Sequence, residues 1–308
     1  MTRAKEHAKS VLKKHGRSFH FASKLLAPEY RLRAARLYAF CRHIDDLADE
    51  STDPELATQQ LEQIHTDIQK GQSTHIVVAD MIALMRELSM PHAPALSLIK
   101  GVQSDLSMQG LKDEAALLRY AYQVAGTVGL MMCVLLDVRD KNAWPFAMDL
   151  GIAMQLTNIA RDVGQDASKG RIYLPVTWIG NISTDDITHP DTAQAQTVQT
   201  ATQRLLALAH VYYQSGLAGM LYLPPAARYG IIVAAAVYRE IGQVVAKSDY
   251  RSWDRRAVVP QTRKIYCASQ ALVRYALQIR SRQSPPQHDP HLHRHLQNCF
   301  GAHDPAST

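Results

Sequence analysis

The sequence predicts an all-α protein whose helices form a single domain. Apolar residues recur at helical spacing along most of the 308-residue chain, whereas the alternation typical of β-strands is scarce. Hydrophobic residues make up 46% of the chain, which is ordinary for a globular protein and ample for a core. No change of composition divides the chain before Ser284, and we find no internal repeat. We therefore expect one helical domain over residues 1–283.

Proline and glycine separate the predicted helices. Helices are expected after Pro28 over residues 31–50 and after Pro54 over residues 55–70, and Pro91 follows a helix over residues 79–88. Further helices are expected over residues 95–108, 113–136, 143–163, 192–221, 225–246 and 262–281, the third of which can continue to Asp166 or beyond. The polar stretch 181–192 is expected to be a loop.

Residues 284–308 differ in composition from the rest of the chain. This segment contains four prolines and five histidines, and we expect it to be a disordered tail. His291, His293 and His295 follow one another at i, i+2 and i+4, which is a weak metal-binding pattern on a proline-flanked segment.

The charge and the motifs that are missing narrow the function classes. A formal charge of +6 suits anionic partners such as nucleic acid, membrane headgroups or diphosphates. Nucleic acid is not expected, because aromatic residues are few and are not interleaved with basic runs. The sequence has no Walker loop and no Gly-x-Gly-x-x-Gly after a strand, and no Ser-His-Asp or Cys-His arrangement stands out.

Several features favour a reduced, intracellular protein. The four cysteines have neither metal-binding nor redox spacing. The basic N-terminus lacks the apolar stretch of a secretory signal. The longest apolar runs, residues 125–136 and 231–237, fall short of the roughly 20 residues that span a bilayer. Any association with a membrane is therefore expected to be peripheral.

The first acidic motif follows an apolar run on the predicted helix over residues 31–50. Asp45 and Asp49 are one helical turn apart and share a face, with Asp46 beside them. Arg42 lies one turn before Asp45 and Asp46, where it can brace a carboxylate or contact a phosphate oxygen. A solvated acidic face is the simpler alternative to a ligand site.

The second acidic motif is more specific. Asn158, Asp162 and Asp166 follow at i, i+4 and i+8, so they form one stripe on a helix. Their carboxylate and amide oxygens suit a hard cation, and Mg²⁺ commonly bridges carboxylates to substrate phosphates. Two such helices can clamp diphosphates through magnesium, which implies chemistry in which diphosphate leaves.

Other candidate residues flank these two motifs. Arg171 can hold a departing diphosphate, and Tyr173 can donate a hydrogen bond to it or cap the cavity. Ser18 follows several basic residues and can help to cradle a phosphate, with Phe19 facing an apolar tail; a simple helix start is the alternative.

A run of small residues, 125–129, includes Gly126 and Gly129. It fits tight helix packing or the wall of a cavity that admits an alkyl chain, and both can hold together. Gln103 and Asp105 are weaker candidates, for which a helix cap or a surface role competes equally.

These motifs, in this order and spacing, resemble the squalene/phytoene synthase family over most of residues 10–275. The resemblance rests on Ser18-Phe19, Tyr38 to Asp49, Val124 to Gly129, Gln155 to Asp166, and Gly170 to Pro175. The sequences from Gln155 to Asp162 and from Val124 to Gly129 are most similar to those of the bacterial phytoene synthases of that family. Gln165 departs from the family, in which an acidic residue is frequent there, but the ligand positions around it are intact.

The resemblance implies an isoprenoid synthase fold, with helices around a central apolar cavity. It also implies head-to-head condensation of two geranylgeranyl diphosphates, through a cyclopropyl diphosphate, to phytoene, the first committed step of carotenoid biosynthesis. The proton acceptor stays open between released diphosphate and a tyrosine such as Tyr38 or Tyr173.

The resemblance carries over a set of site residues. Expected metal ligands are Asp45, Asp49, Asn158, Asp162 and Asp166. Expected catalytic residues are Asp45, Asp49, Asp162, Asp166, Arg171, Tyr173 and Tyr38. Expected substrate-binding residues are Ser18, Phe19, Arg42, Asp46, Gly126, Gly129, Gln155, Asn158 and Arg161.

Mg²⁺ is the expected cofactor, Mn²⁺ is an acceptable substitute, and NADPH is not expected for a phytoene synthase. The nearest alternative is a farnesyl diphosphate-using enzyme that makes squalene, dehydrosqualene or hydroxysqualene. A non-catalytic family member acting as an assembly or binding protein is the alternative from another class. Because substrate and product are so apolar, we expect a cytoplasmic enzyme that works at the inner face of a membrane and hands its product to a downstream desaturase.

Overall fold

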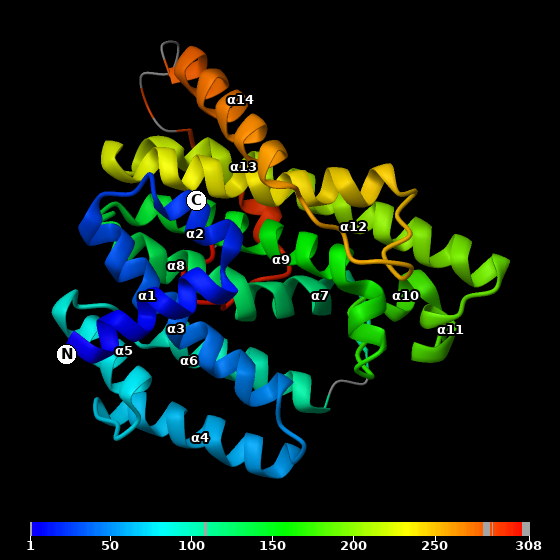
Figure 1. Ribbon diagram of the computed structural model, residues 1–308, viewed down its shortest axis with the longest axis horizontal. Helices are drawn as coiled ribbons and strands as arrows, with labels where there is room; N and C mark the ends of the chain where they lie inside the picture. Colours follow the sequence, from blue (N-terminus) through cyan, green and yellow to red (C-terminus); the bar gives the residue numbers. More distant parts are fainter. Residues whose placement is uncertain (1, 108–109, 280–283, 285, 304–308) are drawn as a thin grey trace.

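The computed structural model describes residues 2–107, 110–279, 284 and 286–303, and every regular element in these ranges is helical (Figure 1). The α-helices are α1 (Thr2–His15), α2 (Arg17–Ser23), α3 (Pro28–Asp49), α4 (Pro54–Lys70), α5 (Ile76–Glu87), α6 (Ala93–Ser104), α7 (Glu114–Ala121), α8 (Thr127–Leu135), α9 (Trp144–Ala167), α10 (Val176–Ile179), α11 (Thr184–Thr188), α12 (Thr192–Ala218), α13 (Pro225–Lys247) and α14 (Gln261–Ile279). The shorter elements are η1 (Asp105–Ser107), η2 (Tyr122–Gly126), η3 (Lys141–Ala143), η4 (Gly219–Tyr222) and η5 (Pro290–His293). The predicted all-α fold class is confirmed.

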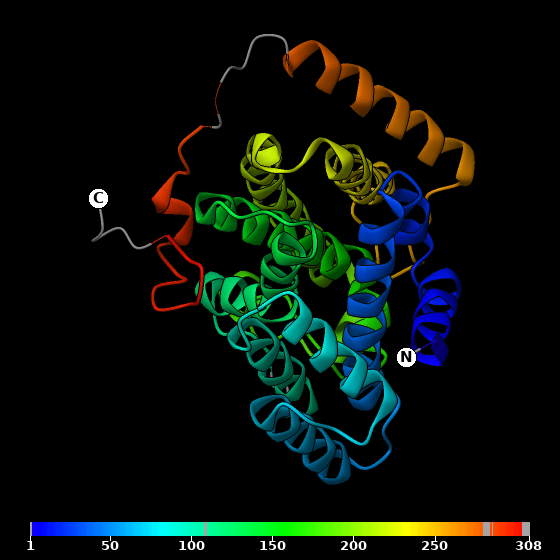
Figure 2. The ribbon, with the colours of Figure 1, turned by 90° about the vertical axis from the view of Figure 1, so that its left-hand side faces the viewer.

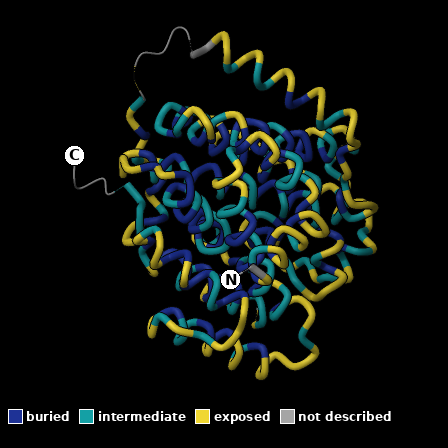
Figure 3. Tube along the Cα trace, turned by 60° about the vertical axis from the view of Figure 1, so that its left-hand side comes forward, coloured by how far each residue is buried: buried dark blue, intermediate teal, exposed yellow. Residues whose placement is uncertain are grey.

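Helix α9 occupies the centre of the fold. It packs against α8, α12 and α13, and the view in Figure 2 shows long helices around a common middle. One buried cluster collects around α9, and a second is formed by α3, α5 and α6 with parts of α1, α4 and α8. Figure 3 shows the buried residues concentrated toward the interior of this bundle. Phe19, Val124 and Met132 pack against both clusters, and they mark the zone where the two halves of the fold meet.

The predicted single helix over residues 113–136 is divided. Helix α7 passes through the π-helix η2 into α8, so the wider turn changes which residues face α9. Two glycines allow η2 and α8 to approach α9 closely: a Cβ on Gly129 would lie 2.1 Å from the carbonyl oxygen of Ala147, and one on Gly151 would lie 2.3 Å from that of Ala125.

Other predicted boundaries differ less. Helices α1 and α2 form in the N-terminal segment, where the sequence gives only a helix start near Ser18, and α11 lies within the predicted loop 181–192. A capping box in which Ser183 and Asp186 exchange hydrogen bonds explains why this short helix forms in a polar stretch. The predicted helix ends at residues 108 and 281 lie outside the described residues.

The prediction of a disordered tail is wrong for the described residues 286–303. His288 and His293 are buried and both hydrogen-bond the carboxylate of Asp149 on α9, at 2.8 and 2.9 Å. The tyrosine hydroxyl of Tyr212 donates to the carbonyl of Leu292 at 2.8 Å, and Leu296 is fully buried. Composition misleads here because a buried carboxylate needs donors, and this segment supplies them. The predicted boundary at residue 283 lies outside the described residues.

Asp149, His288 and His293 lie close enough together to suggest a metal site. The backbone N–H of His303, however, donates to Nδ1 of His293 at 2.9 Å, so that nitrogen is an acceptor and Nε2 carries the proton. A metal-bound imidazole would instead donate from its second nitrogen. The cluster is therefore a hydrogen-bonded clasp that holds residues 286–303 on α9.

Two helical stretches, Glu114–Leu135 and Pro225–Lys247, are long and apolar enough to cross a membrane by length and composition. The sequence alone predicts no stretch long enough to span a bilayer, so this result differs from that expectation. Within the fold, 56% and 61% of their most apolar windows are buried, as in core helices of a bundle, so they are weak support for a membrane span.

Candidate active site

A polar chamber of about 720 Å³ lies between α3 and α9. Helix α3 contributes Asp45 and Asp49 to its wall, and α9 contributes Asn158, Asp162 and Asp166. All five are helical, so the i, i+4 spacing places each set along one face. The two acidic stripes of the sequence therefore border one cavity.

Two of the carboxylates have no partner in the part of the chain that the structure describes. No hydrogen bond or ion pair from a described residue engages the side-chain carboxylate of Asp45 or Asp166. Desolvation raises the pKa of Asp45 to about 7, and the charge of Asp49 adds to this effect. Desolvation, followed by the charge of Asp162, likewise raises the pKa of Asp166 to about 7. Asp45 is nevertheless open to the chamber, so a cation arriving there can reach its carboxylate.

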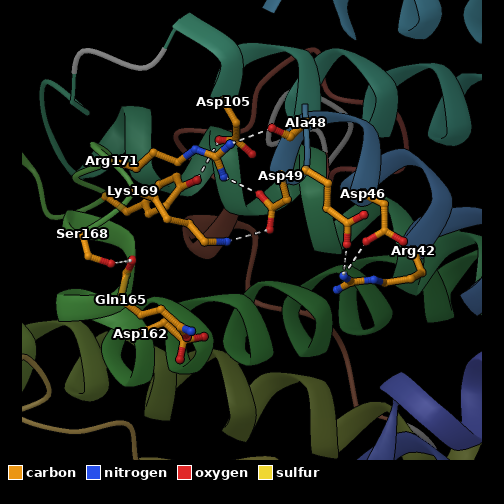
Figure 4. A network of polar contacts seen from close by, with 12 residues as sticks. Arg42, Asp46, Ala48, Asp49, Asp105, Asp162, Gln165, Ser168, Lys169 and Arg171 are labelled. Atoms are coloured by element: carbon orange, nitrogen blue, oxygen red, sulfur yellow. Dashed lines mark hydrogen bonds and ion pairs between the residues drawn. The ribbon is translucent and has the colours of Figure 1, made fainter. Parts of the chain in front are cut away.

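Basic residues from the loop after α9 reach across the chamber to α3. Nζ of Lys169 lies 3.2 Å from Asp49, and Arg171 binds the same carboxylate while donating to the carbonyl of Ala48 at 3.0 Å (Figure 4). Burial alone would raise the pKa of Asp49, but the hydrogen bond and charge of Arg171 lower it overall. The cationic side chains of Lys169 and Arg171 thus contact Asp49, a carboxylate that is expected to bind metal.

Asp162 is also paired with arginines. Arg161 binds it from the same helix, and Nε of Arg256, from the loop before α14, lies 2.7 Å from its Oδ1. Burial raises and the arginines lower its pKa, with the net effect downward. Arg256 is half exposed, so it can exchange this carboxylate for a phosphate oxygen of an incoming ligand.

Asp105 organises a pair of tyrosines at the chamber wall. The hydroxyls of Tyr120 and Tyr173 donate to its two oxygens at 3.0 and 2.9 Å, and their rings stack 5.0 Å apart. Burial raises the pKa of both hydroxyls, so both stay protonated and can donate near neutral pH. Burial also raises the pKa of Asp105, to about 6.

An apolar cavity of about 300 Å³ adjoins the polar chamber. Its wall is formed mainly by Leu26, Leu37, Val128, Met132, Phe146, Leu150, Met154, Met220, Leu223 and Ile231. We call the polar chamber and the apolar cavity the two lobes of the site. They share several residues, which are Phe19, Tyr38, Cys41, Asp45, Val124, Gln155, Asn158 and Tyr238. The combined space therefore fits a ligand with an anionic head and a long apolar tail, as the predicted central cavity requires.

Asn158 tests whether the chamber suits a cation. Its Nδ2 donates to Gln155 at 3.3 Å, while its Oδ1 is buried and finds no donor among the described residues. A buried amide oxygen without a donor is costly unless a cation or a donor on a ligand approaches it. Together with the unpaired Asp45 and Asp166, it forms an oxygen-rich set that fits Mg²⁺.

The structure places most predicted site residues at these walls. Ser18, Arg42, Arg161, Arg171 and Tyr173 line the polar chamber, Tyr38, Phe19 and Gln155 lie where the lobes meet, and Gly129 lines the apolar cavity. Their roles remain predictions.

Two residues predicted to bind substrate lie outside both lobes. Asp46 is turned away from the chamber because it is one residue, about 100° of helix, beyond Asp45, and it pairs with Arg42. Gly126 lies at the end of the π-helix and packs toward Met148 and Ile152 of α9. Substrate binding by these two residues stays a prediction.

Sequence reasoning misses Tyr120, Tyr238 and Arg256, and it ranks Asp105 only as a weak candidate. Tyr238 lies at the junction of the lobes, and its ring is 4.9 Å from that of Phe19. None of these residues stands in an acidic motif, and each reaches the site only through packing of distant helices. A polar residue on an apolar segment, as at Asp105, is the one available signal.

Comparison with known proteins shows which family this chain belongs to. Residues 12–264 match the family model described as squalene/phytoene synthase. The chain belongs to the squalene/phytoene synthase family. A 15-cis-phytoene synthase from Pantoea ananas is 34% identical over 91% of this chain and 94% of its own length. A phytoene synthase from Cereibacter sphaeroides is 37% identical over 84% of this chain and 77% of its own length.

Solved structures of this family share the fold. A dehydrosqualene synthase in complex with a ligand superposes with a TM-score of 0.81 at 27% identity, covering 90% of this chain and 98% of that chain. A squalene synthase from Alicyclobacillus acidocaldarius superposes with a TM-score of 0.70 at 21% identity, over 80% of this chain and 94% of that chain. The predicted isoprenoid synthase fold is thereby confirmed.

Proposed function

We propose that the protein is a prenyltransferase that condenses two molecules of geranylgeranyl diphosphate head to head to give phytoene. The observation that carries the proposal is the continuous two-lobed cavity, in which unpaired carboxylates and arginines meet an apolar wall. The similarity to phytoene synthases over most of the chain supports the same reaction. Phytoene synthesis would place the protein at the first committed step of carotenoid biosynthesis.

Mg²⁺ is the proposed cofactor, with Mn²⁺ as a substitute. Asp45 and Asp49 on one side, and Asn158, Asp162 and Asp166 on the other, would hold it. When bound, it would neutralise negative charge on the diphosphates and so favour their departure. No redox step is needed for phytoene, so NADPH is not required.

Cationic side chains of the protein would stabilise the departing diphosphate. On substrate binding, Lys169, Arg171 and Arg256 would exchange their carboxylate partners for diphosphate oxygens, and Tyr173 would donate a hydrogen bond. The C1–O bond of one substrate breaks, its C1 bonds to the double bond of the second, and a proton leaves to close a cyclopropyl diphosphate.

In the second half-reaction the remaining diphosphate leaves, the carbon skeleton rearranges, and a second proton is lost to form phytoene. The apolar lobe excludes water from the carbocations. Tyr38 and Tyr173 lie at the chamber wall, but burial raises the pKa of Tyr38 to about 12, and that of Tyr173 is raised further. Released diphosphate is therefore the proton acceptor that we favour.

A farnesyl diphosphate substrate is the second candidate, favoured by the superposition on a dehydrosqualene synthase. It would give dehydrosqualene or hydroxysqualene without NADPH, or squalene with it. We further propose that the enzyme is cytoplasmic, binds peripherally at the inner membrane face, and passes its product to a desaturase, because the hydrocarbon is too apolar to cross water.

The deciding experiment is a product assay. Purified protein with Mg²⁺ is incubated with geranylgeranyl or farnesyl diphosphate, each with and without NADPH, in detergent, and the extracted hydrocarbon is identified. Phytoene from geranylgeranyl diphosphate without NADPH is expected. A C30 product from farnesyl diphosphate alone would establish the second candidate instead. Absence of any product would favour a non-catalytic role.

A further inference from the structure

Helix α14 carries an apolar face that the rest of the fold does not cover. Ile265, Tyr266, Val273 and Leu277 are 52%, 50%, 60% and 65% exposed. At 100° per residue these positions fall within about 120° of one another on the helix. The helix lies along the outer edge of the molecule, and exposed residues follow its length (Figures 2 and 3).

A different side of α14 already anchors it to the fold. Ala268 is buried and Leu272 packs beside it, in a small cluster that includes Val233 and Val237 of α13. The exposed apolar face is therefore not needed to attach the helix to α13. It remains available to a partner outside the chain.

The apolar face continues to the entrance of the active-site chamber. Val258, which precedes α14, is 71% exposed and also lines the polar chamber. Lys264, in the first turn of the helix, lines the same chamber. A partner that covers α14 would thus lie beside the polar chamber.

The charge of this region identifies the partner. Residues 255–288 contain seven arginines and lysines and no aspartate or glutamate. Because the whole chain has 34 basic and 28 acidic residues, the remainder has 27 and 28, so the entire positive excess of the protein lies in this segment. Arg255, Lys264 and Arg274 have no carboxylate partner among the described residues, whereas Arg256 and Arg263 do.

Apolar side chains along one face of a helix, flanked by basic residues, are the pattern of a helix that lies in the plane of a lipid headgroup layer. We infer that α14, with Val258, is the surface by which this protein docks on an anionic phospholipid leaflet. This inference deepens the proposed function and rests on its membrane association. Docking in this way would bring the polar chamber, which Val258 and Lys264 line, close to the leaflet, where the alkyl tails of substrate and product partition.

The test measures binding of the full-length protein to vesicles by co-sedimentation. One set of vesicles is pure phosphatidylcholine, and the other also contains phosphatidylglycerol. The wild type is expected to sediment with the anionic vesicles, less with the neutral ones, and less in high salt, because salt screens the headgroup charge. The double variant V273Q/L277Q removes two apolar contacts and is expected to weaken binding by about tenfold or more.

Matched variants separate the docking face from general apolar exposure. The double variant L56Q/V211Q changes two exposed apolar residues on α4 and α12, 49% and 43% exposed, and is expected to bind as the wild type does. The variant R255Q/R274Q is expected to bind anionic vesicles more weakly while binding to neutral vesicles changes little.

The outcomes distinguish the docking surface from the enzymatic proposal. Turnover of V273Q/L277Q in detergent is expected to equal that of the wild type, because neither residue lines the active site. If this variant binds vesicles as tightly as the wild type, α14 is not the docking surface. If the wild type binds no vesicle, membrane docking itself is wrong and an acidic protein becomes the partner to seek. Loss of product in detergent would concern the proposed function alone.

Discussion

Helix α9 carries aspartates near its two ends, and their surroundings are opposite. Asp149 is fully buried and accepts hydrogen bonds from His288, His293 and Ser215. Burial alone would raise its pKa, but the two histidine hydrogen bonds lower it overall. Asp166, 17 residues later on the same helix, has no such donor, and desolvation raises its pKa to about 7.

The comparison distinguishes Asp149, a carboxylate that stabilises the fold, from Asp166, a carboxylate that is open to a ligand. The donors around Asp149 compensate for the loss of water, so that group is satisfied within the chain. Asp166 and Asp45 face an open chamber without donors, and only a bound cation or a proton compensates for their charge. Changing each type of aspartate should therefore affect different measurements.

The largest effect is expected from Asp166→Asn. Removing an anionic ligand for Mg²⁺ should lower turnover by about 10³-fold. The melting temperature should stay the same or rise, because a poorly solvated carboxylate is replaced by a neutral group. A product assay and thermal denaturation measure the two effects. Asp185→Asn, on the exposed surface of α11, is the control that should change neither. Wild-type turnover in Asp166→Asn would remove this residue from the site.

Asp149→Ala should show the reverse pattern. It leaves two buried histidines and a serine without their acceptor, and the free energy of unfolding should fall by about 3–5 kcal/mol. Turnover per folded molecule, measured at low temperature, should change little, because Asp149 lines neither lobe. Urea denaturation measures the stability change. An unaltered unfolding midpoint would show that the clasp does not stabilise the fold.

The substitution Arg171→Lys tests a carboxylate inside the chamber that is paired, in contrast to Asp166. Lysine keeps the charge but lacks the planar, forked guanidinium with which Arg171 contacts Asp49 and the carbonyl of Ala48. We expect kcat/KM to fall by about 10²-fold with a small change in melting temperature. Arg204→Lys, whose partner Glu114 lies away from the chamber, is the matched control. Equal losses in the two variants would show that the effect at Arg171 is not specific to the site.

The smallest effect is the pH dependence of stability without Mg²⁺. Folded Asp45 and Asp166 hold their protons up to about pH 7, whereas unfolded carboxyls release them near about pH 4. The folded state binds more protons in this window, so the free energy of unfolding should fall as the pH rises through it. Thermal denaturation in EDTA measures this decline, which the variant D45N/D166N should flatten.

Asp149 should act in the opposite direction. Its pKa is lowered in the folded state, so its contribution is present above the ordinary carboxyl pKa and is lost as the pH falls through the folded value. Added Mg²⁺ should raise the melting temperature more at high pH than at low pH, because protons compete for Asp45 and Asp166. A stabilisation by Mg²⁺ that is independent of pH would contradict this account of the two groups.

The sequence by itself determined the fold class and the acidic stripes of α3 and α9. These features depend on helical periodicity, which relates residues only three or four positions apart and can be read directly. The same local pattern identified Asn158, whose amide oxygen proved to be buried without a donor. The order of the motifs was sufficient to point to the family.

Only the tertiary structure decided which aspartates are paired and which are open. Asp49 meets Arg171 across 122 residues of chain, and Asp149 meets His293 across 144. Such contacts depend on how helices pack and on the wider turn of η2, and no local spacing encodes them. The described part of the C-terminal segment became ordered for the same reason: its histidines are donors for a buried carboxylate that composition alone cannot reveal.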